Sequence, residues 1–173
     1  MGQQICYIIS PDDVQVPLEI VHFKEQDCTV FPLLVTDTDY ENILNYSEPE
    51  NSEEFFHEFM IHCGYEYLNR RVADFMSEKK LQNFAMINYG NFSSIGDSFP
   101  LLFIDGQCNS LPWENFENES HRKLGIAFTF LELIRNEAKY RSFLDAEDYY
   151  FRELEKFIDN SYRTLGGNGL HAR

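Results

Sequence analysis

The sequence predicts one α+β domain: N-terminal antiparallel strands, a central helix, two further strands, and two long C-terminal helices packed on one sheet. Three observations predict it. Short apolar segments separated by turn residues fill the first 36 positions, apolar residues at helical spacing fill the middle and the end, and no repeat or Pro/Gly-rich linker divides the chain. A chain of 173 residues that is 43% hydrophobic can bury a core. We therefore expect a single α+β domain over residues 1–165 and a flexible C-terminal tail over residues 166–173.

Three extended segments open the chain. Residues 5–10 are apolar, residues 14–20 alternate between apolar and polar, and residues 28–36 form a third apolar stretch. Pro17 cannot donate a ladder hydrogen bond, which favours an edge position for the second segment. The close turns between the three predict an antiparallel meander.

The central helix is predicted to start at Asn51, whose side chain can cap the helix while Glu54 occupies the third helical position. Its apolar stripe continues to Lys79 and Lys80, and Gly64 marks a kink or a close contact within it. Two strands follow, at 84–89 and 99–105, and a loop at 90–96 joins them.

Helical spacing dominates the sequence from about Asn118 onward. One stripe covers residues 124–134, Asp145 caps a second helix, and a second stripe covers residues 150–165. Gly166 and Gly167 then end the helix.

The charge of the chain is its most specific feature. Residues 25–69 hold eleven carboxylates and no Lys or Arg, and eight aromatic residues lie among them. The net charge is -15, and residues 1–50 contain ten acids and one base. Direct nucleic-acid binding needs clustered cations, so this composition argues against it and favours a basic protein partner.

Catalytic and metal-binding patterns are not found. His57 and His62 stand five residues apart, whereas a zinc-protease helix places its histidines four apart. The segment from Asp37 to Glu41 lacks the glycine and the distal glutamate of a calcium loop. We expect no catalytic residue, no metal and no cofactor. The four cysteines are expected to be free thiols of a cytoplasmic protein, because no secretory signal or membrane span is evident.

Two segments resemble known families. Residues 101–114 resemble the strand and Pro-Trp-Glu segment of separase and related caspase-like peptidases, but no cysteine follows Cys108 to complete a His–Cys dyad. Residues 96–105, Trp113 and residues 126–134 are similar to the second half of SUKH-type toxin-immunity proteins. That resemblance implies a strand, a Trp-bearing strand and a helix in succession, and a role in neutralising a toxin.

The sequence thus predicts an acidic, non-enzymatic binding protein that neutralises a basic partner, and a bacterial toxin-immunity protein fits best. Alternatives are a DNA mimic that inhibits a DNA-binding protein, a hydrolase or transferase whose Asp/Glu/His site assembles only in the fold, a subunit that docks through its C-terminal helices, and an acidic domain whose charge only maintains solubility. No membrane partner is expected. The expected partner-binding residues are Asp37, Asp39, Tyr40, Glu41, Tyr46, Glu48, Glu50, Glu53 and Glu54.

Overall fold

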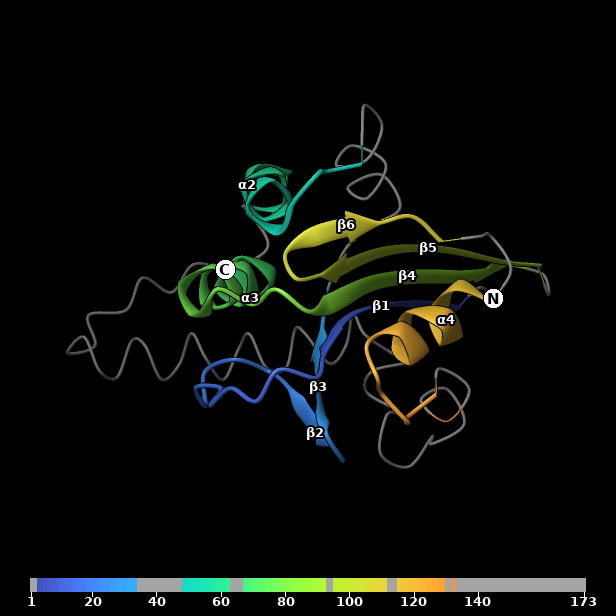
Figure 1. Ribbon diagram of the computed structural model, residues 1–173, viewed down its shortest axis with the longest axis horizontal. Helices are drawn as coiled ribbons and strands as arrows, with labels where there is room; N and C mark the ends of the chain where they lie inside the picture. The colour runs from blue at the N-terminus through green and yellow to red at the C-terminus, as the bar shows by residue number, and fades with distance from the viewer. Residues whose placement is uncertain are drawn as a thin grey trace, which may run out of the picture.

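A six-stranded antiparallel sheet forms the centre of the molecule, with helices on both of its faces (Figure 1). The computed structural model describes residues 3–33, 48–62, 67–92, 95–111, 115–129 and 132. The sheet order is β2-β3-β1-β4-β5-β6. The strands are β1 (Gln3–Ser10), β2 (Phe23–Glu25), β3 (Cys28–Pro32), β4 (Phe84–Phe92), β5 (Ile95–Ile104) and β6 (Gln107–Asn109). The helices are α2 (Ser52–His62), α3 (Tyr67–Lys79) and α4 (Phe116–Lys123).

Strand β1 lies inside the sheet, between β3 and β4. Tyr7 is opposite Pro32 on one side and Ile87 on the other. Side chains of a strand alternate between the two faces of the sheet, and here both faces are covered. Ile8 packs in one core cluster and Tyr7 in the other. Burial on both faces explains why this strand reads as a continuous apolar run.

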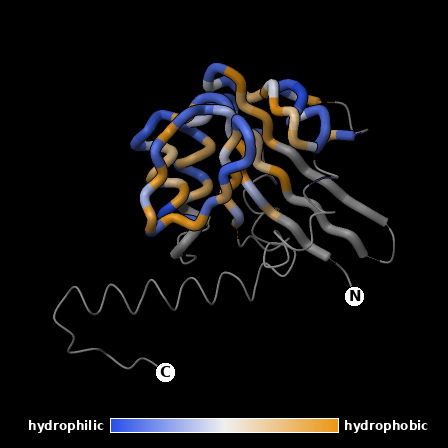
Figure 2. Tube along the Cα trace, turned by 90° about the horizontal axis from the view of Figure 1, so that it is seen from below, coloured by the Kyte–Doolittle hydropathy of each residue, from blue (hydrophilic) through white to orange (hydrophobic). Residues whose placement is uncertain are grey.

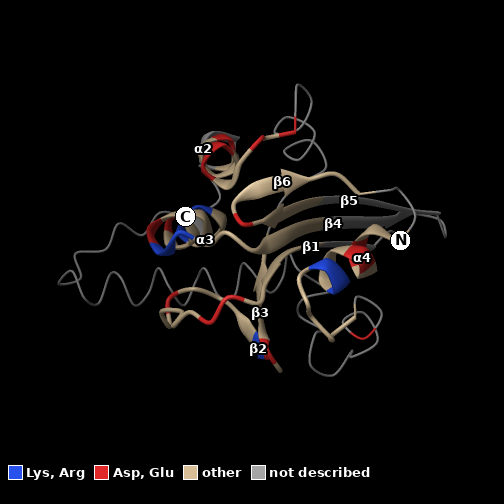
Figure 3. Ribbon diagram, viewed as in Figure 1, with Lys and Arg blue, Asp and Glu red and all other residues tan. Residues whose placement is uncertain are grey.

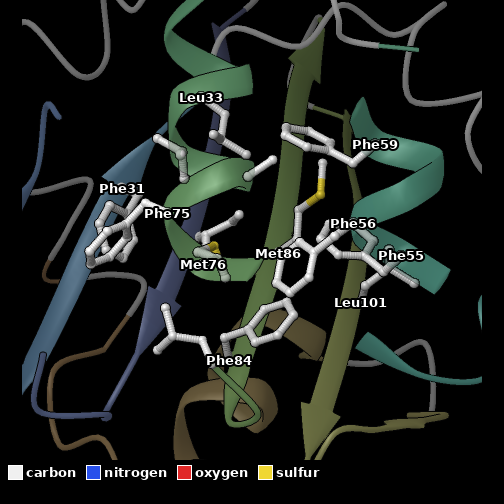
Figure 4. Packing of buried hydrophobic residues seen from close by; sticks show 14 of the residues in the cluster. Phe31, Leu33, Phe55, Phe56, Phe59, Phe75, Met76, Phe84, Met86 and Leu101 are labelled. Carbon is white, nitrogen blue, oxygen red and sulfur yellow. The ribbon is translucent and has the colours of Figure 1, made fainter. Parts of the chain in front are cut away.

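The larger core lies between the sheet and the helices α2 and α3, and aromatic rings fill much of it (Figure 4). The Phe55 ring lies 5.3 Å from that of Phe103 and 5.8 Å from that of Phe84, centroid to centroid. Phe84 and Phe103 stack at 4.7 Å. Hydrophobic and hydrophilic stretches alternate along the described chain in Figure 2. The apolar residues of α2 and α3, among them Phe59 and Met76, are buried in this core.

The opposite face of the sheet is covered by α4 and the chain that follows it. Ile126 and Phe128 are buried against Ile9, Val30 and Leu102. This second core is smaller, and its cover is a short helix with an irregular segment.

The mixed α and β composition and the antiparallel sheet are confirmed. The predicted strands at 5–10, 84–89 and 99–105 lie within β1, β4 and β5, apart from Asp105 in the turn that follows, and β3 covers the first part of the predicted 28–36 strand. Residues 34–36 lie outside the described residues.

The predicted strand at 14–20 is wrong. This segment forms no strand, and the Ile20 amide donates to the Pro17 carbonyl in a turn. Its alternation nevertheless has a cause, because Val14, Val16 and Ile20 pack toward the larger core. The strand beside β3 is instead the three-residue β2, and β6 is equally short. Three residues are too few to give a periodic pattern.

Two further predictions need correction. The single central helix is two helices, since α2 ends at His62, α3 begins at Tyr67, and the two pack against each other. Gly64 lies outside the described residues. The predicted loop at 90–96 is also wrong for most of its length, because β4 extends to Phe92, β5 begins at Ile95, and the two pair from Phe84 with Phe103 to Phe92 with Ile95. Residues 93–94 lie outside the described residues.

The predicted helix from Asn118 is confirmed only as far as Lys123, the last residue of α4. Gly125 has a positive φ of 72°, a conformation that ends helices, so the continuous stripe from Leu124 is wrong at its start. Thr129 and Glu132 then exchange hydrogen bonds in a capping-box arrangement. The rest of the predicted C-terminal helices, with the predicted tail, lies outside the described residues. Among the described helices none is long and apolar enough to cross a membrane.

Replacing Phe55 should test the aromatic core. Its side chain is fully buried among four other phenylalanine rings. We expect Phe55→Ala to lower the free energy of unfolding by about 3–5 kcal/mol, through lost burial and a cavity. Urea unfolding followed by circular dichroism measures the change. The matched control is Leu18→Ala at a side chain that is 98% exposed, where a change within about 0.5 kcal/mol is expected. Equal midpoints for the two variants would contradict this packing.

Candidate functional site

Residues 48–54, which we call the acidic segment, run along the outer edge of β6. The Cys108 amide donates to the Glu50 carbonyl at 3.1 Å, and the Ser52 amide donates to the Gly106 carbonyl at 2.9 Å. Between them, Asn51 forms an antiparallel bridge with Gln107. These hydrogen bonds cover an edge that would otherwise offer free backbone groups. The acidic segment is therefore held at a fixed place on the sheet.

Local chemistry then turns the acidic segment into the first turn of α2. The Glu54 amide donates to Asn51 Oδ1 at 2.9 Å, as the sequence predicts for a cap. The Glu54 carboxylate in turn accepts a hydrogen bond from the Glu50 amide at 3.0 Å. Both contacts satisfy backbone N–H groups at the helix start. The predicted Asn51 cap is confirmed, while the Glu54 carboxylate bonds the Glu50 amide and not the Asn51 amide of a standard capping box.

The carboxylates of the acidic segment face solvent. Glu48, Glu50, Glu53 and Glu54 are exposed, while Pro49 between the first two is buried. Glu48 accepts a hydrogen bond of 3.4 Å from the Ser110 hydroxyl. Arg122 forms an ion pair with Glu119 on α4. For the four glutamates of the acidic segment, no salt bridge to a Lys or Arg is found among the described residues.

Further acids lie at the same end of the sheet (Figure 3). Asn83 connects them: its side chain and amide lie 3.4–3.5 Å from the Asp12 carboxylate, and its Oδ1 accepts from the Asp105 amide at 3.0 Å. Asp105 is exposed in the turn between β5 and β6. That turn also carries Gly106, which bonds the acidic segment. The fold thus adds Asp12 and Asp105 to the acidic region.

Helix α3 carries charges of both signs. Arg70, Lys79 and Lys80 are exposed on it or directly after it, and Asp74 and Glu78 accompany them. Figure 3 shows both colours on α3. Among the described residues, we call the acids of the acidic segment, Asp105 in the β5–β6 turn, and Asp12 and Asp13 in the loop after β1 the acidic region.

The predicted site residues divide into two groups. Glu48, Glu50, Glu53 and Glu54 are brought together on one exposed segment. Asp37, Asp39, Tyr40, Glu41 and Tyr46 lie outside the described residues. Phe55, Phe56 and Phe59, which follow the acidic residues in the sequence, are buried in the core. Sequence reasoning missed Asp12 and Asp105, which only the pairing of β1, β4 and β5 brings near the segment.

A second group of polar side chains is buried under α4. His121 is 1% exposed, and its Nδ1 lies 2.6 Å from the Phe128 carbonyl. A carbonyl can only accept, so Nδ1 carries the proton and Nε2 accepts from the Tyr7 hydroxyl at 3.0 Å. The imidazole thus ties the segment after α4 to the central strand. This arrangement gives His121 a structural role.

Burial sets the ionisation of this pair. It lowers the pKa of the His121 imidazole, and the hydrogen bond to the Phe128 carbonyl partly opposes the shift. Burial, together with the nearby Glu117 carboxylate, raises the pKa of the Tyr7 hydroxyl well above its usual value. Both groups are therefore neutral near pH 7.

Burial raises the pKa of the Cys28 and Cys108 thiols to about 11. These two thiols are therefore protonated near pH 7, which makes them poor nucleophiles. Cys63 lies outside the described residues. Among the residues with described side chains, no three His, Cys, Asp or Glu are grouped as metal ligands would be.

No protein-family model matches the chain, and the searches for similar curated proteins and similar solved structures likewise found no match. The separase-like and SUKH-like stretches therefore stand as resemblances of short segments. Residues 96–104 of the SUKH-like stretch and residues 101–104 of the separase-like stretch lie in β5. Trp113 is outside the described residues, and residues 126–128 are not helical.

The His121 pair predicts a pH dependence of stability. The unfolded chain binds a proton on His121 at about pH 6.5, whereas the folded chain does so only at lower pH. The neutral His121 side chain therefore adds its full share to the free energy of unfolding above about pH 6.5. As the pH falls from there toward the folded pKa, this share decreases by at most about 1.4 kcal/mol per pH unit. Urea unfolding at pH 7.5 and pH 5.0 measures it. His121→Gln should lose this part of the pH dependence, and identical slopes for the two proteins would refute the assignment.

Proposed function

We propose that the protein is an acidic, non-enzymatic binding protein that neutralises a basic protein partner, as a bacterial toxin-immunity protein does. The observation that supports it best is the acidic segment, in which backbone hydrogen bonds to β6 hold four glutamates outward. No Lys or Arg of the described residues forms a salt bridge with these glutamates. A cationic surface on a partner, such as the active site of a nuclease toxin, would compensate it.

The binding mechanism follows from where the charge lies. Fixed carboxylates of one sign attract a cationic partner over several ångströms and increase the rate of encounter. Apolar contacts formed after encounter determine how long the complex lasts. The acidic segment is ordered before binding, so its backbone loses little entropy on association. These features favour fast, salt-sensitive recognition.

The remaining expected residues belong to the same proposal. Asp37, Asp39, Tyr40, Glu41 and Tyr46 precede the acidic segment in sequence and would extend its charge and add aromatic contacts. The proposal also retains the prediction of C-terminal helices beyond Thr129, packed on the same domain.

Neutralising two glutamates should slow association. We expect the double variant Glu50→Gln/Glu53→Gln to bind more slowly, with an association rate constant about two- to tenfold lower at 50 mM salt and a nearly unchanged dissociation rate. The partner is the protein that co-purifies with the tagged chain from its source cells, identified by mass spectrometry. Surface plasmon resonance at 50 and 500 mM salt gives both rate constants.

The matched control is Asp74→Asn/Glu78→Gln, which removes the same charge from exposed positions on α3. Its association rate should stay closer to that of the unaltered protein. A partner without a basic surface, or association rates that do not change with salt, would disprove the proposed function.

A further inference from the structure

The loop between β1 and β2 places one large apolar side chain in water. Leu18 is 98% exposed and is the exposed large hydrophobic residue found among the described side chains. Burying a leucine is worth about 1.5–3 kcal/mol, so the fold forgoes that stabilisation at this position. Single exposed apolar residues are common on proteins, and the exposure alone assigns no role. The construction of the loop around Leu18 is the second observation.

The loop is fixed to the protein on both sides of Leu18. Before it, Val14 and Val16 pack on the larger core, and after it Ile20 is buried in that core. The Ile20 amide donates to the Pro17 carbonyl at 3.1 Å, which makes Leu18 and Glu19 the two central residues of a β-turn. Turn centres usually carry polar residues.

Side-chain hydrogen bonds reinforce both ends of the loop. The Asp12 amide donates to Ser10 Oγ at 3.1 Å at its start. At its end the His22 ring nitrogen Nδ1 lies 2.8 Å from the Ile20 carbonyl, and the Lys24 ammonium lies 3.5 Å from the Val14 carbonyl. The turn is therefore ordered before anything binds to it. A side chain presented in this way loses little conformational freedom on binding.

The charge around the loop is negative. Asp13 and Glu19 are exposed on it, and Asp12 at its base is joined through Asn83 to Asp105 of the acidic region. Lys24 is the one cation in the first 50 residues. The loop thus starts at the same end of the sheet as the acidic segment (Figure 3).

We propose that Leu18 is an apolar anchor that inserts into a pocket on a basic protein partner, while the acids on the loop and at its base contact cations around that pocket. The inference rests on the proposed function and adds to it the residue that provides lasting affinity. Anchors of this kind sit in pockets ringed by polar contacts and account for much of the binding energy of an interface. None of the residues predicted from the sequence to bind the partner lies in this loop.

The test uses the full chain and the partner protein that co-purifies with it. We expect Leu18→Ala to raise the dissociation constant about tenfold or more, mainly through faster dissociation, with the salt dependence of association kept. Leu18→Met should restore most of the affinity, because methionine has a similar volume. Gln15→Ala, at an exposed polar position of the same loop, is the matched control and should bind like the unaltered protein.

The outcomes separate the two proposals. If Glu50→Gln/Glu53→Gln slows association but Leu18→Ala changes the dissociation constant less than twofold, the anchor is disproved and the proposed function stands. If Leu18→Ala weakens binding but association does not respond to salt, the basic partner is disproved and both proposals fail. A benzophenone amino acid in place of Leu18 should cross-link to the partner under light. A cross-link only between two copies of the chain, or none, overturns the anchor.

Discussion

The hydrogen bonds between the acidic segment and β6 are the constraint on which the fold and the proposed function both depend. They end the sheet on one side by satisfying the Gly106 carbonyl and the Cys108 amide. They also fix where α2 begins, and hence where Phe55 enters the core three residues after the first helical position. The same pairing directs Glu48 and Glu50 outward, with Pro49 buried between them. These backbone hydrogen bonds therefore link the aromatic core to the charged surface.

Much of the fold could be predicted because its central elements carry strong local signals. The apolar run of β1 predicts a strand. The Asn51 cap and the phenylalanines that follow it predict the start and the buried side of α2. The errors fall where tertiary contacts override a local pattern. Residues 14–20 alternate like a strand, but the apolar side chains bury against the core while Pro17 and Ile20 close a turn. The stripe after α4 is broken at Gly125, where a positive φ matters more than the spacing of its neighbours.

The candidate site could be predicted less completely, for a physical reason. A count of acids along the chain identifies Glu48, Glu50, Glu53 and Glu54, because they are close in sequence. Asp12 and Asp105 lie 93 positions apart and meet only through Asn83 at the start of β4. Leu18 is exposed because it lies in a turn, where the sequence pattern predicts a strand. Acids that are close in sequence can therefore be identified from the sequence alone, whereas acids that strand pairing brings together cannot.

The glutamates of the acidic segment also have structural roles, and these must be separated from binding. Glu53 and Glu54 lie in the first turn of α2, where negative charge is favourable because of the helix dipole. Glu48 and Glu50 lie on an edge, where charge discourages pairing with another sheet. Each role explains the presence of some acids at little cost in stability. Neither explains a neighbouring loop that is tightly anchored and yet presents Leu18 to water. Stability measurements report on the dipole and the edge, whereas association and dissociation rates report on recognition. For this reason the proposed function is tested by association and dissociation rates.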